Sequence, residues 1–127
     1  MLLVNFSHPL DTAQVAEVEA LVGAPIEGVA DIPVQFDDSL PYGPQAEALA
    51  DGAGLSASDW QTRPLLLVLP GHSLIAATLM AVLHGRTGHF PAVLRLRRAP
   101  GPVVRFTAAE VVGLQDLRER SRLARVS

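Results

Sequence analysis

The segment from Pro64 to Gly85 constrains the fold more than any other part of this chain, because none of its residues is formally charged. Its 22 residues are enough to span a lipid bilayer as one helix. The turn-forming stretch Pro70-Gly71-His72-Ser73 divides it, however, into apolar pieces of six and twelve residues, each too short to span. We therefore expect a buried strand over 65–69 and then a buried helix from Leu74 to His84, ended by Gly85.

The predicted strand at 65–69 is an unbroken apolar run, which is typical of a strand buried on both faces at the centre of a parallel sheet. The helix after it has apolar residues on every side, so we expect more than one layer of the protein to cover it. Such burial needs a sizeable core, and a chain of 127 residues can bury roughly two-thirds of its surface. This length also predicts a single domain, 1–127.

Predicted strands and helices alternate along the chain. Asp11 followed by Gln14 is a capping-box pattern that opens a helix, and Gly23 ends it. Ser56 and Asp59 form a similar pattern before a short helical turn that contains Trp60. The other predicted elements are strands at 2–6, 26–36 and 91–97 and helices at 44–53 and 114–125.

The segment 103–112 is ambiguous. Thr107 and Glu110 have the spacing of a capping box, but Gly113 would then fall inside a helix, so an extended segment is preferred.

This alternation predicts an α/β fold of Rossmann-like type, with a mainly parallel sheet and helices on both of its faces. The apolar strands at 2–6 and 65–69 belong in the middle of the sheet. The strand at 26–36 contains Pro33, which favours an edge position. The predicted strand order is therefore 2-1-3-4, with any fifth strand beyond the fourth.

Charge is divided unevenly between the two halves of the chain. Residues 1–62 carry ten acidic residues and neither Lys nor Arg, whereas residues 63–127 carry ten Arg and three acidic residues, so the halves are −10 and +7. Such asymmetry indicates an anionic partner or self-association. The net charge of −3 disfavours binding to long duplex nucleic acid.

Missing residue types and motifs exclude several kinds of chemistry. The chain has no cysteine and no lysine, which excludes disulfides, thiolate catalysis, a Schiff base and a P-loop lysine. Gly-rich dinucleotide and nucleotide-triphosphate motifs are missing, and 71–74 is not a hydrolase nucleophile elbow. The opening MLLVNFSHP lacks the basic segment of a signal peptide, so we expect a cytoplasmic protein without a membrane helix. We expect no metal and no cofactor.

Candidate ligand residues follow from the predicted topology, because parallel α/β sheets bind ligands beyond the carboxyl ends of their strands, at the switch point between the first and third. Two turns meet there, 5–9 and 70–73, and each precedes a helix whose free amides favour an anion. The predicted ligand residues in these turns are Asn5, Ser7, His8, Gly71, His72 and Ser73. The alternative is that Gly71 only forms a turn and Ser73 only caps a helix.

His8 and His72 are the predicted catalytic residues, because a histidine pair at this rim can supply acid–base catalysis, bind phosphate or hold a metal. The spacing of His84 and His89 matches no metal site, so we expect them to be structural. Asp37 and Asp38, after the second strand, could bind a ribose hydroxyl or a metal, with turn and cap chemistry as the alternative, and Asp37 is the predicted ligand residue.

Arginines form two groups. Arg95 and Arg97 share one face of the fourth predicted strand and are predicted to bind phosphate through their guanidinium groups. The arginines of the last helix are expected to form a solvated face.

Four segments resemble a small family of accessory proteins encoded beside type III CRISPR systems: NFSHPL (5–10), VQFDDSLPYGPQ (34–45), WQTRPLLLVLPGHS (60–73) and HGRTGHFPAVLRLRR (84–98). The resemblance runs over nearly the whole chain. It implies a fold related to CRISPR-associated Rossmann-fold sensor domains, and a homodimer that holds a cyclic oligoadenylate across its two-fold axis. Some proteins of this neighbourhood cleave this second messenger in antiviral defence and are called ring nucleases, and others sequester it.

The resemblance thus implies binding of cyclic tetra-adenylate and metal-independent cleavage, in which a ribose 2′-hydroxyl attacks the adjacent phosphorus and His8 or His72 acts as acid or base. Two alternatives remain open. One is a sponge that binds the ring without cleaving it. The other is an interaction module whose acidic and basic halves assemble subunits, including by head-to-tail stacking.

Overall fold

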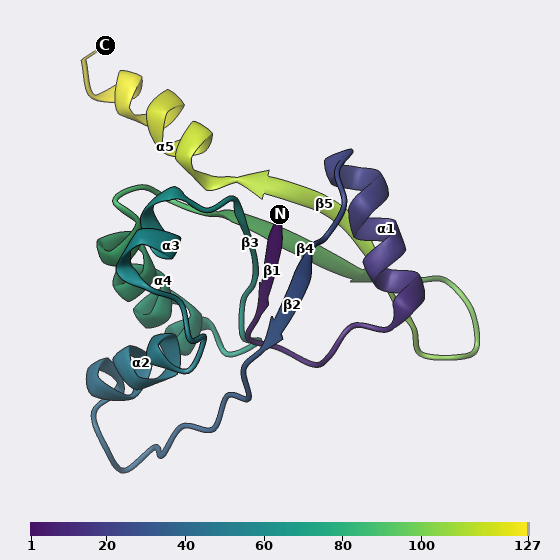
Figure 1. The fold of residues 1–127 in the computed structure, drawn as a ribbon, viewed down its shortest axis with the longest axis horizontal. Coiled ribbons are helices and arrows are strands. Elements are labelled where there is room, and N and C mark those ends of the chain that lie inside the picture. Colours follow the sequence, from purple (N-terminus) through teal and green to yellow (C-terminus); the bar gives the residue numbers. More distant parts are fainter. Residues whose placement is uncertain (127) are drawn as a thin grey trace.

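The computed structural model describes residues 1–126 as an α/β fold built on one five-stranded sheet (Figure 1). Its strands are β1 (Leu2–Asn5), β2 (Gly28–Asp31), β3 (Leu65–Val68), β4 (Ala92–Arg98) and β5 (Phe106–Gly113). They lie in the order β2-β1-β3-β4-β5, and only β5 runs antiparallel to its neighbour within these residues. The predicted order, with a fifth strand beyond the fourth, is confirmed.

Helices cover both faces of this sheet, as predicted. They are α1 (Thr12–Val22), α2 (Tyr42–Asp51), α3 (Ala57–Thr62), α4 (Ser73–Thr87) and α5 (Leu114–Leu123), followed by a 3-10 turn over Ala124–Val126. Figure 1 shows α1 on one side of the sheet, α2, α3 and α4 on the other, and α5 extending away from it. No helix of the described residues is both long and apolar enough to cross a membrane.

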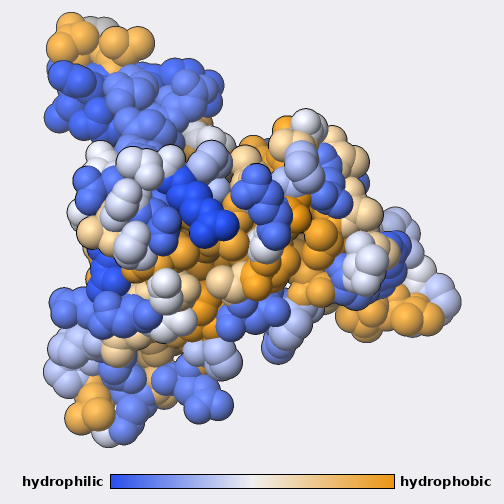
Figure 2. Space-filling model, in the orientation of Figure 1, coloured by the Kyte–Doolittle hydropathy of each residue, from blue (hydrophilic) through white to orange (hydrophobic). Residues whose placement is uncertain are grey.

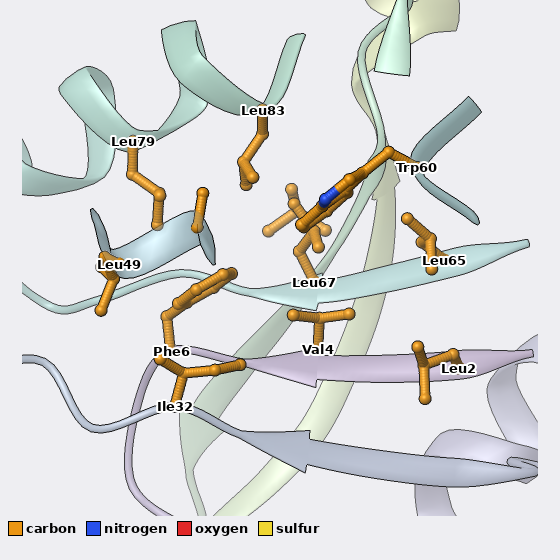
Figure 3. Close-up of a cluster of buried hydrophobic side chains, with 12 residues drawn as sticks. Leu2, Val4, Phe6, Ile32, Leu49, Trp60, Leu65, Leu67, Leu79 and Leu83 are labelled. Atoms are coloured by element: carbon orange, nitrogen blue, oxygen red, sulfur yellow. The ribbon is translucent and has the colours of Figure 1, made fainter. Parts of the chain in front are cut away.

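The central strands supply two hydrophobic cores, because consecutive side chains of a strand point to opposite faces. Val4 and Leu67 pack on the face covered by α2, α3 and α4 (Figure 3). Leu3 and Leu66 pack on the opposite face, with Val18 of α1. Every residue of β3 is buried, so the predicted central strand is confirmed.

The capping signals predicted for α1 and α3 are confirmed. The Asp11 carboxylate accepts the Gln14 amide at 2.8 Å, and the Gln14 side chain accepts the Asp11 amide at 2.9 Å. Ser56 caps α3 in the same way through the amide of Asp59, at 3.0 Å. Gly23 ends α1 in the left-handed conformation, with φ 67°. The ambiguous segment is extended, as preferred, and forms β5.

The second strand is shorter than predicted, because β2 ends at Asp31 and 32–36 is not a strand. Its neighbour β1 ends at Asn5, whose carbonyl accepts the amide of Ile32 at 2.8 Å, so the chain beyond has lost its pairing partner. The alternation of apolar residues in 32–36 reflects packing on the core, where Ile32 is 7% exposed. Pro33 lies just past the end of an edge strand.

The fourth helix is longer and less covered than predicted. α4 continues through Gly85, which is exposed, and ends at Gly88 with φ 80°. A glycine inside a helix lowers stability by only about 1 kcal/mol relative to alanine, so a helix can continue through it. The left-handed backbone position at a helix end, in contrast, strongly favours glycine. One stripe of α4 is buried, at Ile75, Leu79, Leu83 and Thr87. Leu74 is 58% exposed, so the expected cover on every side was wrong.

Two further helix boundaries differ from the prediction. α2 begins at Tyr42 rather than at 44, because the Gln45 side chain closes the preceding loop by donating to the carbonyls of Leu40 and Pro41 at 3.2 and 3.0 Å. α5 ends at Leu123, and the chain tightens into the 3-10 turn that follows.

Candidate functional site

Two open clefts lie at the carboxyl ends of β1 and β3, where the strand order reverses. The first has a volume of about 470 Å³ and includes His72 and the 31–35 segment in its lining. The second has a volume of about 430 Å³ and includes Arg95 and Phe106. Ser7, His8, Pro9 and Gly71 line both clefts, and we call these four residues the shared wall. The fold thus brings together the turns after β1 and β3.

Asn5, at the end of β1, stabilises the turn that follows this strand. Its side chain is fully buried, and its amide nitrogen donates to the Asp31 carboxylate and to the His8 carbonyl, both at 2.9 Å. Its amide oxygen accepts the backbone N–H of Ser7 at 3.0 Å. These three bonds point Asn5 into the protein, so we assign it a positioning role for the shared wall.

His8 projects from that turn into solvent. Its residue is exposed, and its imidazole makes no hydrogen bond or ion pair with any part of the chain that the structure describes. Both ring nitrogens are therefore open to a ligand in either cleft.

His72, rather than Ser73, caps α4. Its Nδ1 accepts the backbone N–H of Ile75 at 3.3 Å, so the neutral ring that makes this bond carries its proton on Nε2. The rings of His72 and Tyr42 lie edge to face, with their centroids 6.1 Å apart. Ser73 is the first residue of the helix, where backbone N–H groups have no partner inside the helix. Gly71, His72 and Ser73 are all exposed.

The two arginines predicted to bind phosphate differ in their surroundings. Arg95 lines the second cleft and pairs with Glu110, across the strand ladder, at 2.6 Å. Both side chains are 52% exposed, and an exposed pair of this kind is worth little, so a ligand can compete for the guanidinium. Arg97 is exposed and makes no ion pair within residues 1–126, but it lines neither cleft.

Asp37 organises its own loop. Its carboxylate accepts the Ser39 hydroxyl at 2.6 Å and the Ser39 amide at 2.9 Å, and these bonds lower the pKa of Asp37 below its ordinary value. Asp37 lines neither cleft, so the arrangement favours turn chemistry. Contact between Asp37 and a ligand stays a prediction.

Sequence reasoning missed several residues of the cleft walls. Pro33 and Val34 line the first cleft because β2 ends at Asp31, so residues predicted to lie within the strand follow its carboxyl end instead. Phe106 lines the second cleft from the first position of β5. The only signal for Phe106 was an aromatic residue after the turn of 100–102, which gave no clue to the neighbouring strand ends.

Metal chemistry finds no support in the described residues. Nowhere in residues 1–126 do three or more His, Asp or Glu side chains gather in a way that could hold a metal ion.

The comparisons with known proteins return no relative. No family model matches the chain, no curated protein matches it, and no solved structure matches it. The resemblance to type III CRISPR accessory proteins stays a prediction, and function has to be argued from the clefts.

Proposed function

We propose that this is a Rossmann-like protein that binds cyclic oligoadenylate, with cyclic tetra-adenylate as the first candidate, along its two clefts. The observation that carries the proposal is the shared wall. A phosphodiester that passes from one cleft to the other crosses the exposed imidazole of His8 and the start of α4. Helix N-termini stabilise anions through their free amides and their dipole.

A symmetric ring calls for a symmetric site, so the proposal includes a homodimer. A ring of four nucleotides presents the same phosphodiester twice across a two-fold axis, and an isologous dimer presents two copies of the shared wall in the same relation. The chain's all-arginine positive charge supports phosphate binding, since guanidinium groups match phosphate geometry.

The proposed reaction is metal-independent ring cleavage. The ribose 2′-oxygen forms a bond to the adjacent phosphorus, and the bond from phosphorus to the 5′-oxygen breaks. The 2′-hydroxyl proton passes to a base, a proton is delivered to the leaving 5′-oxygen, and the products are a 2′,3′-cyclic phosphate and a 5′-hydroxyl. His8 suits the base because its ring is unpartnered within residues 1–126. His72 can deliver that proton only as an imidazolium, and protonation of Nδ1 breaks its bond to the Ile75 amide, so His72 as the donor requires loss of the helix cap.

The test is incubation with radiolabelled cyclic tri-, tetra- and hexa-adenylate, with and without EDTA, followed by chromatography. We expect linear products with a 2′,3′-cyclic phosphate, in amounts that EDTA does not change. His8→Ala should slow cleavage by about 10²- to 10⁴-fold, the usual contribution of acid–base catalysis. Arg122→Ala, on exposed α5 and outside both cleft linings, is the matched control and should leave the rate unchanged. A protein that neither binds nor cleaves any ring refutes the proposal.

Sequestration without cleavage is the second candidate, and the capping bond of His72 favours it. A ring nitrogen that accepts the Ile75 amide cannot also take a proton without breaking that bond, so only His8 is free to act as a base. Intact ring that co-purifies with the protein, with no linear product after long incubation, would establish this function in place of cleavage.

A further inference from the structure

The second cleft differs chemically from the first, because its lining includes an exposed aromatic ring and an arginine and has no carboxylate from the described residues, whereas Asp31 lines the first. The apolar residues of this lining are Pro9, Leu10, Val68, Leu69, Leu94, Leu96 and Phe106. Phe106 is 46% exposed, whereas the core aromatic residues Phe6 and Trp60 are 1% and 3% exposed. The binding of phosphate alone does not require such a surface.

Phe106 is held firmly although it starts an edge strand. Its carbonyl accepts a hydrogen bond from the Gln14 side chain of α1 at 2.9 Å. Two residues further on, the amide of Ala108 donates to the Glu17 carboxylate of the same helix at 3.2 Å. The backbone beneath the ring is thus anchored before a ligand arrives, which reduces the entropy that binding costs.

The side chains with polar groups in this cleft are those of Ser7, His8, Gln14 and Arg95. Arg95 supplies a planar guanidinium, and Ser7 and His8 belong to the shared wall. An apolar slot with an aromatic face, an arginine and a nearby phosphate site is the combination by which proteins hold an unstacked nucleobase. The volume of about 430 Å³ lies within the usual range for small-molecule sites.

We propose that the second cleft is a purine-base site, in which the base stacks on Phe106 and turns its edge toward Arg95. This inference rests on the proposed function, since the base belongs to a nucleotide whose phosphate lies at the shared wall. On this inference, adenine binds in the second cleft, and the sugar-phosphate backbone continues into the first. An apolar peptide fits less well, because the wall next to the cleft is polar at Ser7 and His8, and His8 is exposed.

The experiment is calorimetric titration of cyclic tetra-adenylate into the wild type and three variants. Phe106→Ala should weaken binding by about 5- to 30-fold, the lower part of the range for loss of one base–aromatic stack. Phe106→Trp should keep or improve affinity, and the new indole should be quenched as the ring binds. Val103→Ala is the matched control, because Val103 is 75% exposed and does not line the cleft. It lies in the loop between β4 and β5, where Figure 2 shows hydrophobic surface.

The outcomes separate this inference from the proposed function. A wild type that binds no ring refutes both. A wild type that binds, with Phe106→Ala and Val103→Ala both unchanged and no quenching in Phe106→Trp, refutes only the base site. A loss confined to Phe106→Ala, with quenching in Phe106→Trp, supports it, and the quenching gives a readout even if the alanine variant folds poorly.

Discussion

Replacing Asn5 with alanine tests whether one buried amide organises the candidate site. The side chain has no exposed surface, and it makes three hydrogen bonds, to Ser7, His8 and Asp31, at 2.9 to 3.0 Å. Removing it leaves two backbone groups of the turn after β1 without their partner. The turn also carries three of the four residues of the shared wall.

The expected cost follows from these bonds. Each hydrogen bond contributes about 0.5–1.5 kcal/mol, and the partners are partly exposed, so water can replace some of the loss. We expect Asn5→Ala to lower the free energy of unfolding by about 2–3 kcal/mol. For a chain of 127 residues this corresponds to a fall in Tm of roughly 7–11 °C. Ring binding should weaken as well, because the wall is no longer held.

The assay is urea unfolding followed by circular dichroism, with thermal melts as a second probe. Asp31→Ala is the matched control, because it removes only one of the three bonds and should cost about 1 kcal/mol or less. Neutral surface substitutions usually change the free energy of unfolding by no more than about 0.5 kcal/mol. If Asn5→Ala changes it by no more than that, the amide does not hold the turn and the reasoning fails.

Three further predictions concern local structure. Gly88→Ala should lower the free energy of unfolding by about 1 kcal/mol, because φ is 80° at this position. Gly85→Ala, inside α4, should raise it by about 0.5–1 kcal/mol, because open space surrounds the added methyl group. Ser56→Ala should cost about 1 kcal/mol by removing the α3 cap. Hydrogen bonds from Ser39 lower the pKa of Asp37. Their contribution to folding stability is therefore present above pH 3.8 and is lost as the pH falls further. Ser39→Ala should raise that pKa toward 3.8.

Chemical denaturation measures the first two of these predictions, and carboxyl-carbon NMR titration measures the third. Equal effects of the two glycine substitutions would contradict the assigned end of α4. An unchanged melting curve for Ser56→Ala would show that its cap is replaced by water. An Asp37 titration that does not move in Ser39→Ala would assign the lowered pKa to another cause.

Features that depend on neighbouring residues were predictable from the sequence. Capping boxes at the starts of α1 and α3 involve residues three positions apart, so their hydrogen bonds form wherever the helix forms. The apolar run of β3 can only be satisfied by burial on both faces, which places it in the middle of a sheet. The switch point then follows from strand order, and with it the meeting of the turns that contain Ser7 and Gly71.

Features that depend on a partner distant in sequence were not predictable. The end of β2 is set by the length of β1, because a strand lasts only as long as its neighbour can pair with it. The roles of Asn5 and His72 depend on which donors the fold brings within reach, namely the amides of Ser7 and Ile75. Arg95 could be placed on a strand, but its pairing with Glu110 required the register of an antiparallel neighbour.

Charge shows the same division. The sequence alone determined that the first half is acidic and the second half carries every arginine, and that a local positive edge could serve a small anion. Tertiary structure decided which of those charges remain available, because folding pairs Glu17 with Arg105 and Asp51 with Arg86 across the two halves. It also decided that a cleft opens beside Phe106, since that surface is assembled from the ends of β1 and β3, the middle of β4 and the start of β5, which meet only when the sheet forms.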